Sequence, residues 1–162
     1  MKNLILIRHA KSNWEATASD LDRPLSRKGI TDAFSVSDAI NKYLPKKFIV
    51  WSSIAKRAKE TAIIYAQNLS IPLDTIIFKE ELYTFDEDHL ERTIKDCDNK
   101  YSSIVLFGHN EAITNFVNKF GDETFDTIPT SGFVSISFNE DDWGFIKNGK
   151  VVKTVFPRHL KE

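Results

Sequence analysis

The feature that most constrains this chain is a set of short, wholly apolar runs separated by longer amphipathic segments. Residues 4–7, 48–51 and 104–107 each consist of four consecutive apolar side chains. Such a run is typical of a strand buried on both faces of a parallel sheet, because a strand with one face in water would alternate polar and apolar residues. The alternation with helical segments predicts an α/β domain, with helices on both faces of a mostly parallel sheet.

Four segments between and beyond these runs have the apolar spacing of amphipathic helices. Ser26 is a good N-cap for a helix that extends to about Tyr43. Further helices are expected over residues 56–69, 87–98 and 111–120. Gly121 is suited to end the last of them. A shorter strand is expected over residues 71–78.

The C-terminal part of the chain changes character. Residues 133–138 alternate, and residues 150–156 form a second β-like stretch after a turn around Asn148 and Gly149. We expect these two strands to extend the sheet in the antiparallel sense. The fold class predicted is therefore a three-layer α/β/α domain with a mostly parallel mixed sheet, and residues 1–162 are expected to form a single domain.

The composition is that of an ordinary globular protein, with 41% hydrophobic and 28% charged residues. A net charge of −1 provides no general attraction for nucleic acid or for an anionic membrane, so we expect neither as a partner. The apolar run at residues 4–7 is too short for a secretory leader or a membrane span. A lone Cys97 fits a reducing compartment, and we expect a cytoplasmic protein. The sequence predicts no oligomeric state.

Chemistry-bearing residues follow three of the expected strands. Arg8 and His9 end the first strand, Arg57 lies shortly after the second, and His109 follows the strand at residues 104–107. In open α/β sheets, ligands bind beyond the carboxyl ends of the strands. The strand assignment therefore predicts that two arginines and two histidines meet at one edge of the sheet.

Such a cluster suits phosphoryl transfer. Guanidinium groups form paired hydrogen bonds with phosphate oxygens and stay charged. A neutral imidazole is a good nucleophile near pH 7 and can carry a phosphoryl group covalently. Nearby cations favour the neutral imidazole and attract the anion, and no metal ion or cofactor is required. Taken alone, each of the four residues also has a structural interpretation, and it is their joint placement that favours function.

Other candidates have simpler interpretations. His89 and His159 could join His9 and His109 around a metal, but no closely spaced ligand pair occurs. Cys97 falls on the apolar face of its helix and is interpreted as core. The acidic run at residues 86–88 suits a helix start. Lys11 and Trp14 could contact substrate at the rim, or Trp14 could pack. The turn at residues 130–132 could offer a hydroxyl or a backbone N–H to phosphate, or simply reverse the chain.

The residues in this order also resemble a known family. The string Leu6-Ile7-Arg8-His9-Ala10-Lys11-Ser12, followed by Trp14, is similar to the opening motif of the histidine phosphatase (phosphoglycerate mutase-like) superfamily, nearest to its SixA-like phosphohistidine phosphatases. The similarity continues through residues 22–26 and Gly29, Ser52 with Arg57-Ala58 and Thr61-Ala62, residues 107–110, and residues 130–132. These blocks follow the family's order and span most of the chain.

The resemblance implies a phosphoglycerate mutase-like fold and a role for each matched residue. His9 would be the phosphorylated nucleophile, Arg8 and Arg57 would clamp the phosphoryl oxygens, and His109 would bind the same group. Lys11 and Ser12, two and three residues after His9, are expected to contact substrate. The family usually has glycine where this chain has Ala10, a change that SixA-like relatives share.

A second departure bears on the substrate. Many ester-cleaving members carry an acidic residue soon after a leucine in the middle of the chain, whereas here Leu82 is followed by Tyr83 and Thr84. Loss of a general acid should slow ester hydrolysis by roughly 10²–10⁴-fold, while a phosphorylated imidazole leaves with little help. We therefore expect a phosphatase acting on phosphohistidine in a protein. The alternatives are a small-molecule phosphomonoesterase and a non-catalytic phosphate-binding domain. One of the nearby carboxylates could still serve as the acid: Glu80, Glu81, Asp86, Glu87 or Asp88.

Overall fold

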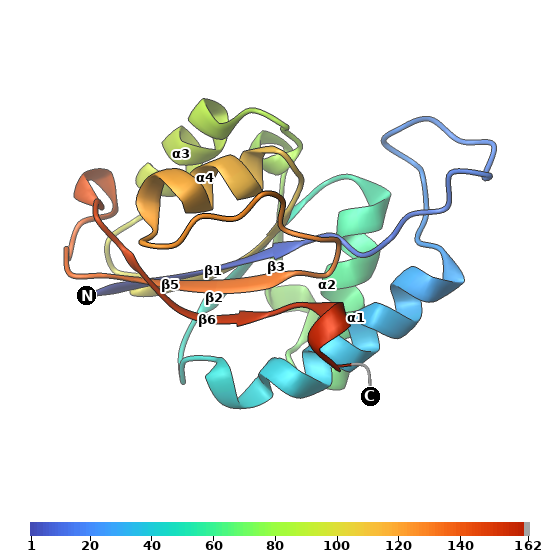
Figure 1. The fold of residues 1–162 in the computed structure, drawn as a ribbon, viewed down its shortest axis with the longest axis horizontal. Coiled ribbons are helices and arrows are strands. Elements are labelled where there is room, and N and C mark those ends of the chain that lie inside the picture. Colours follow the sequence, from blue (N-terminus) through green and yellow to red (C-terminus); the bar gives the residue numbers. More distant parts are fainter. Residues whose placement is uncertain (161–162) are drawn as a thin grey trace.

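The computed structural model describes residues 1–160, in which six strands form one mixed sheet (Figure 1). The strands are β1 (Lys2–Arg8), β2 (Ile49–Ser53), β3 (Ile76–Lys79), β4 (Ser103–Gly108), β5 (Phe133–Phe138) and β6 (Lys150–Val155). Their order across the sheet is β3-β2-β4-β1-β5-β6. The first four are mutually parallel, whereas β5 is antiparallel to both β1 and β6. The predicted mixed, mostly parallel sheet is confirmed.

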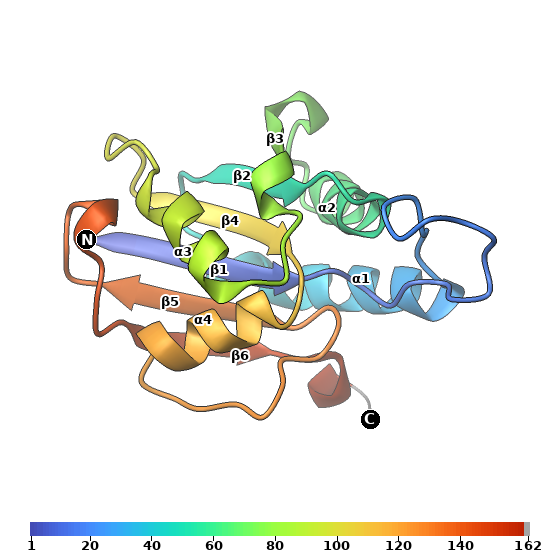
Figure 2. The ribbon, with the colours of Figure 1, turned by 90° about the horizontal axis from the view of Figure 1, so that it is seen from above.

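Helices cover both faces of this sheet (Figures 1 and 2). The helices are α1 (Arg27–Ile40), α2 (Lys56–Asn68), α3 (Glu87–Lys95) and α4 (Ala112–Phe120). Alternate residues of β1 point to opposite cores: Ile5 and Ile7 pack with α1 and α2, and Leu4 and Leu6 with α3 and α4. The three-layer prediction is confirmed. No helix within the described residues is both long and apolar enough to cross a membrane.

The predicted elements differ from the observed ones mainly at their ends. Ser26 caps α1 by accepting a hydrogen bond from the backbone N–H of Gly29, but the helix ends at Ile40 and passes into a 3₁₀ turn over Asn41–Tyr43. The strand expected over residues 71–78 begins only at Ile76, because a 3₁₀ turn over Leu73–Thr75 follows the proline. A loop with a 3₁₀ turn of its own joins β5 to β6, and Asn148 has a φ of 47° there.

The carboxyl ends of β1, β2 and β4 meet at one edge of the sheet. A long connection over residues 9–26 projects beyond this edge before α1 begins (blue in Figures 1 and 2). Two contacts fix its base: an isolated bridge pairs Ser12 with Leu25, and Gly29 packs directly on the Lys11 backbone. A Cβ at Gly29 would lie 2.1 Å from the Lys11 carbonyl oxygen, so only glycine permits this approach. The connection is thereby held over the candidate site.

Candidate active site

Three elements bring the four predicted residues to one place. Arg8 ends β1 and His9 follows it, Arg57 lies in the first turn of α2, and His109 follows β4. Arg8, His9 and Arg57 line a cavity of about 560 Å³ at the carboxyl edge of the sheet. The His109 ring lies beside that of His9, with the ring centroids 5.3 Å apart. The convergence expected from strand ends alone is present in the structure.

Hydrogen bonding fixes the orientation of the His9 ring. Its Nδ1 lies 2.7 Å from the Ala10 carbonyl oxygen, which can only accept, so Nδ1 carries the proton and Nε2 keeps its lone pair. The Ala10 N–H in turn donates to Thr61 Oγ1 at 3.0 Å, which holds this carbonyl in place. Burial lowers the pKa of His9 to about 3, and the nearby Arg57 and Arg8 charges act in the same direction. His9 is therefore a neutral imidazole with a basic Nε2.

His109 is held by a buried serine that sequence reasoning did not select as a site residue. Ser53 Oγ lies 2.8 Å from His109 Nε2 and also accepts the Ala55 N–H at 3.1 Å. We assign Ser53 Oγ as the donor to Nε2, which leaves the ring proton on Nδ1. Burial, with the neighbouring His9 and Arg57, lowers the pKa of His109 to about 2. His109 is then a neutral donor rather than a cation.

Both arginines make hydrogen bonds within the protein, and each also has an N–H group without an acceptor in residues 1–160. Arg57 is 1% exposed, and both its terminal nitrogens bind Asp20, while Arg8 Nη1 donates to the Ile128 carbonyl oxygen at 2.7 Å. Within residues 1–160, the buried Arg8 Nε, Arg57 Nε and His109 Nδ1 have no hydrogen-bond partner. A buried donor without an acceptor costs about 1–3 kcal/mol. Phosphoryl oxygens are the acceptors that such donors bind most strongly.

Asp20 is the main feature of the site that the sequence did not reveal. Its carboxylate accepts hydrogen bonds from Arg23 Nη1 at 2.8 Å, from Arg57 Nη2 at 3.1 Å and from the Tyr83 hydroxyl. Partial burial raises the pKa of Asp20, but these three donors outweigh it and hold the pKa well below its usual range. Asp20 lies in a polar segment without periodicity, so no sequence signal marked it. Arg23 could have been found, because it lies within one of the matched blocks.

The carboxylates that the sequence offered as a general acid lie elsewhere. None of the five lines the cavity that contains His9, and Glu81 faces a different cavity. Asp86 instead caps α3 by accepting the Asp88 N–H at 3.3 Å, in keeping with the interpretation of a helix start. Among the residues described, Asp20 is the one carboxylate that lines the His9 cavity.

The rim of the cavity includes Lys11, Ser12, Trp14 and Phe85. Lys11 is exposed and lines the cavity, as expected for a substrate contact. Ser12 also lines it, but its hydroxyl accepts a hydrogen bond from Arg23 Nε at 2.8 Å, so it positions that arginine. The exposed Trp14 ring stacks on the same arginine, with the guanidinium carbon 3.5 Å from the ring centroid. Phe85, half exposed, completes the aromatic part of the rim.

The turn at residues 130–132 does reverse the chain. The Ser131 N–H donates to the Arg8 and His9 carbonyl oxygens, and the Gly132 N–H donates to that of Pro129, so neither amide is available for phosphate. Ser131 has a φ of 59°, in the left-handed region, and its hydroxyl is buried without a partner in residues 1–160. The turn thus locks the segment that carries Arg8 and His9.

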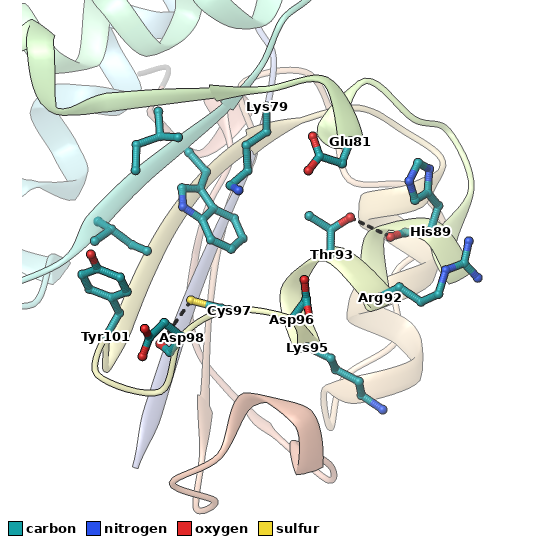
Figure 3. A pocket seen from close by; sticks show the side chains of 13 residues that line it. Lys79, Glu81, His89, Arg92, Thr93, Lys95, Asp96, Cys97, Asp98 and Tyr101 are labelled. Carbon is teal, nitrogen blue, oxygen red and sulfur yellow. Dashed lines mark hydrogen bonds between the residues drawn. The ribbon is translucent and has the colours of Figure 1, made fainter.

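A larger cavity, of about 740 Å³, lies beside α3 and β3 and contains none of the four predicted residues (Figure 3). His89 and Cys97 line it together with side chains of both charges. Burial raises the pKa of Cys97 to about 11, which fits a core thiol rather than a nucleophile. His159 stacks on Phe156, so the four histidines are not gathered around one point. The four predicted residues gather instead at the smaller cavity.

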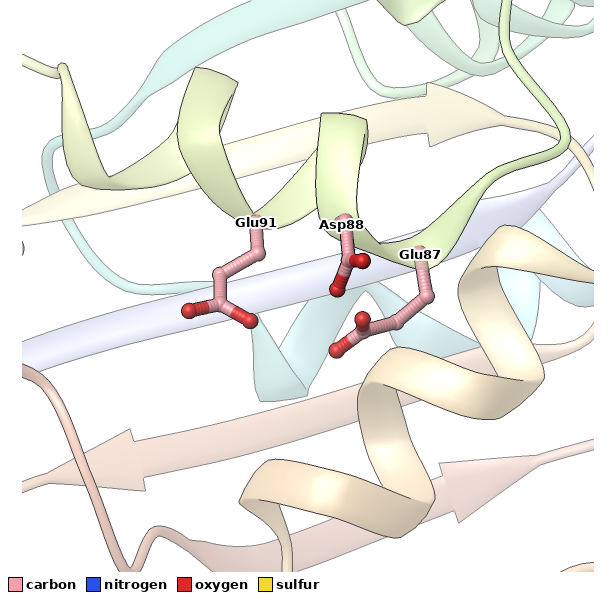
Figure 4. Close-up of side chains that lie close together, drawn as sticks. All are labelled: Glu87, Asp88 and Glu91. Atoms are coloured by element: carbon pink, nitrogen blue, oxygen red, sulfur yellow. The ribbon is translucent and has the colours of Figure 1, made fainter.

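Three carboxylates on one face of α3 form the one cluster in residues 1–160 with metal-ligand spacing (Figure 4). The oxygens of Glu87, Asp88 and Glu91 lie within 4.8 Å of one another. Lys119 pairs with Glu91 at 2.7 Å and with Glu87 at 3.7 Å. The lysine from α4 therefore balances part of this charge, and the cluster joins two helices.

Comparisons with known proteins agree with this geometry. Residues 4–83 match the family model for the histidine phosphatase superfamily (branch 1). An uncharacterized chloroplastic protein from Arabidopsis thaliana is 32% identical over 121 residues, which are 68% of this chain, and the chain spans 55% of that protein's length.

Solved structures share the whole fold. The protein histidine phosphatase SixA, complexed with tungstate, superposes with a TM-score of 0.81 at 22% identity, covering 98% of this chain and 99% of that one. A mycobacterial glucosyl-3-phosphoglycerate phosphatase gives a TM-score of 0.67 at 14% identity, covering 93% and 97%. With the family match and the site geometry together, the chain belongs to the histidine phosphatase superfamily.

Proposed function

We propose that this chain is a metal-independent phosphatase that removes phosphate from phosphohistidine in a protein, through a phosphorylated His9. The observation that carries the proposal is the pairing of a neutral His9, with Nε2 unprotonated, and three buried donors that have no acceptor among residues 1–160. A phosphate-binding domain would need the donors, but it would not need a nucleophile held in one tautomer.

The first step transfers the phosphoryl group to the enzyme. His9 Nε2 forms a bond to phosphorus as the bond from phosphorus to the leaving group breaks, and the leaving group keeps that electron pair. The Ala10 carbonyl stabilises the positive charge that develops on the His9 ring. The phosphoryl oxygens accept hydrogen bonds from Arg8, Arg57 and the Nδ1–H of His109, which are in place before the reaction begins.

The second step releases phosphate. Water attacks phosphorus, the bond from phosphorus to His9 Nε2 breaks, and the proton lost by water passes to phosphate or solvent. His9 returns to the neutral form that its buried site favours. Two guanidinium groups supply the positive charge that a metal ion supplies in other phosphatases, so the proposed mechanism needs no metal and no cofactor.

Two features support phosphohistidine over an alkyl phosphate ester. Asp20, the carboxylate that lines the cavity in the described part of the chain, is bound by two arginines and stays ionised, so it is a poor proton donor for an alkoxide. The cavity mouth carries Trp14, 77% exposed, and Phe85, 53% exposed, which leaves room for a side chain presented on another protein. A cytoplasmic location remains a prediction from the sequence.

The test is phosphate release from a phosphohistidine-bearing protein in the presence of EDTA. Wild type should release phosphate, His9→Ala should not, and His89→Ala, whose histidine lines the other cavity, should behave as wild type. Equal release by His9→Ala would mean that His9 is not the nucleophile. No release by wild type would favour a binding domain or a different substrate.

A second comparison separates the two enzymatic possibilities. The same preparation is given a phosphohistidine peptide and 3-phosphoglycerate, and the two kcat/KM values are compared. We expect the peptide to be cleaved faster, because its leaving group needs no carboxylic acid. Faster cleavage of 3-phosphoglycerate would identify a small-molecule phosphomonoesterase instead.

A further inference from the structure

Asp20 places a negative charge in a cavity otherwise built for an anion. Its carboxylate lines the same cavity as His9, and its neighbours there include Arg8, Arg23 and Arg57. A carboxylate in this position repels a phosphoryl dianion. It also weakens the attraction of Arg23 and Arg57 for that dianion, because it partly neutralises their charge. Asp20 therefore lowers the affinity of the site for phosphate. A contact between Asp20 and another part of the substrate would offset this loss.

The Asp20 carboxylate has one acceptor position left for a hydrogen bond from the substrate. Each carboxylate oxygen has two acceptor positions. Tyr83 and Arg57 use both positions of Oδ2, whereas Arg23 uses one position of Oδ1. The side chain of Asp20 is 45% exposed, so the remaining position on Oδ1 is open to an incoming donor.

Aromatic rings stand beside this acceptor. Trp14 stacks on Arg23, and Phe85 packs edge-on against His109, with the ring centroids 5.5 Å apart. Both aromatic side chains line the cavity together with Asp20. The cavity mouth therefore combines flat apolar surfaces with one anionic acceptor, which is the complement of a flat cationic ring.

The chemistry of a phosphorylated imidazole explains why this complement matters. When phosphorus is bonded to one ring nitrogen, the other nitrogen can carry a proton, and the ring is then cationic. If His9 attacks this form, the breaking bond returns its electron pair to the departing nitrogen. The ring leaves as a neutral imidazole that retains its N–H on the other nitrogen. A group that favours the cationic form thus removes the need for a general acid.

Resting on the proposed function, we infer that Asp20 is a specificity-determining residue that accepts a hydrogen bond from the free ring N–H of a phosphohistidine substrate. It holds the substrate ring in its cationic, labile form between the aromatic side chains at the cavity mouth. A phosphate ester of an alcohol has no such N–H and meets only the repulsion. Asp20 therefore selects for the leaving group, while Arg8, Arg57 and His109 bind the phosphoryl group.

The experiment compares two substrates on one variant. Asp20→Asn keeps the shape of the side chain and removes its charge. A phosphohistidine peptide needs the contact, whereas p-nitrophenyl phosphate does not, because its phenolate leaves without a proton. We expect the ratio of kcat/KM for the peptide to kcat/KM for p-nitrophenyl phosphate to fall about 10- to 100-fold, as for loss of a hydrogen bond between charged groups.

Two controls accompany this comparison. The first is Asp22→Asn. Asp22 lies on the same connection as Asp20, but its carboxylate contacts Ser19 and does not line the cavity. This substitution should leave kcat/KM unchanged for both substrates. Inhibition by inorganic phosphate reports whether Arg57 is still in place in Asp20→Asn, and we expect it to be unchanged or stronger.

The outcomes separate the inference from the proposed function. An equal loss on both substrates, with weaker inhibition by phosphate, would overturn the inference and leave Asp20 as a residue that merely positions arginines. Wild-type kcat/KM on both substrates, and hence an unchanged ratio between them, would also overturn it. Wild-type enzyme that cleaves p-nitrophenyl phosphate and not the peptide would overturn the proposed substrate, and the inference with it.

Discussion

Replacing Ser53 by alanine tests how the second histidine is held in one tautomer. Ser53 is fully buried, and its hydroxyl joins two groups: His109 Nε2 at 2.8 Å and the Ala55 N–H at 3.1 Å. Alanine removes both contacts and leaves a space too small for a well-bonded water. His109 Nε2 and the Ala55 N–H then lose the hydrogen bonds that they make to Ser53.

The magnitude follows from these two groups. Each buried polar group left without a partner costs about 1–3 kcal/mol, so Ser53→Ala, which leaves two, should lower the free energy of unfolding by about 2–6 kcal/mol. Activity should fall as well, because nothing then keeps the proton on His109 Nδ1. Loss of one charge-assisted hydrogen bond to the phosphoryl group should reduce kcat/KM by about 10- to 100-fold.

Urea unfolding measures the first quantity, and steady-state hydrolysis of p-nitrophenyl phosphate measures the second. Ser52→Ala is the matched control, because Ser52 is equally buried on the same strand and its hydroxyl donates to the Ser53 carbonyl oxygen, at 2.9 Å, rather than to His109. Nitrogen-15 NMR of the imidazole rings reports the tautomer directly. In wild type we expect the His109 proton on Nδ1, and in Ser53→Ala a mixture of tautomers.

If Ser53→Ala unfolds at the same urea concentration as Ser52→Ala and keeps wild-type kcat/KM, then Ser53 does not hold the His109 tautomer. A loss of stability with an unchanged NMR tautomer and unchanged activity would reduce Ser53 to a packing residue.

Three further predictions concern the buried histidines, the arginine clamp and the base of the long connection. Burial lowers the pKa of His9 to about 3 and that of His109 to about 2, from an ordinary value of 6.5. Between the ordinary pKa of 6.5 and these lowered values, the unfolded chain binds more protons than the folded one. The free energy of unfolding is therefore unaffected by these histidines above pH 6.5 and decreases as the pH falls below it. Urea unfolding at pH 7 and pH 5 should differ by on the order of 1–2 kcal/mol per histidine, with a shallower dependence in His109→Asn, and equal slopes would contradict the assignment. Arg57→Lys should lower kcat/KM for phosphate release by about 100-fold or more, since one ammonium cannot replace a three-nitrogen fork; near-normal activity would show that the fork is unnecessary. Gly29→Ala should lower thermal stability by about 1–3 kcal/mol, because its Cβ would lie 2.1 Å from the Lys11 carbonyl oxygen, and a neutral result would mean that the backbone there adapts freely.

Much of the architecture could be predicted from local patterns. Wholly apolar runs indicated β1, β2 and β4, because only a strand buried on both faces needs no polar side chain. Once those strands were placed, the general rule for open sheets was enough to bring His9, Arg57 and His109 to one edge. The errors lay at element ends, such as the late start of β3, where turn geometry competes with apolar propensity.

The details of the candidate site depended on contacts that no local pattern encodes. Asp20 meets Arg57 and Tyr83 across separations of 37 and 63 residues, from a polar connection without periodicity. Ser53 looked like the end of a strand until the fold placed its hydroxyl on His109. Amino-acid order therefore determined which side chains reach the edge of the sheet, since burial of apolar faces is a local property. Protonation states, tautomers and the partner of each arginine were settled by tertiary packing, because they depend on which distant groups exclude water from one another.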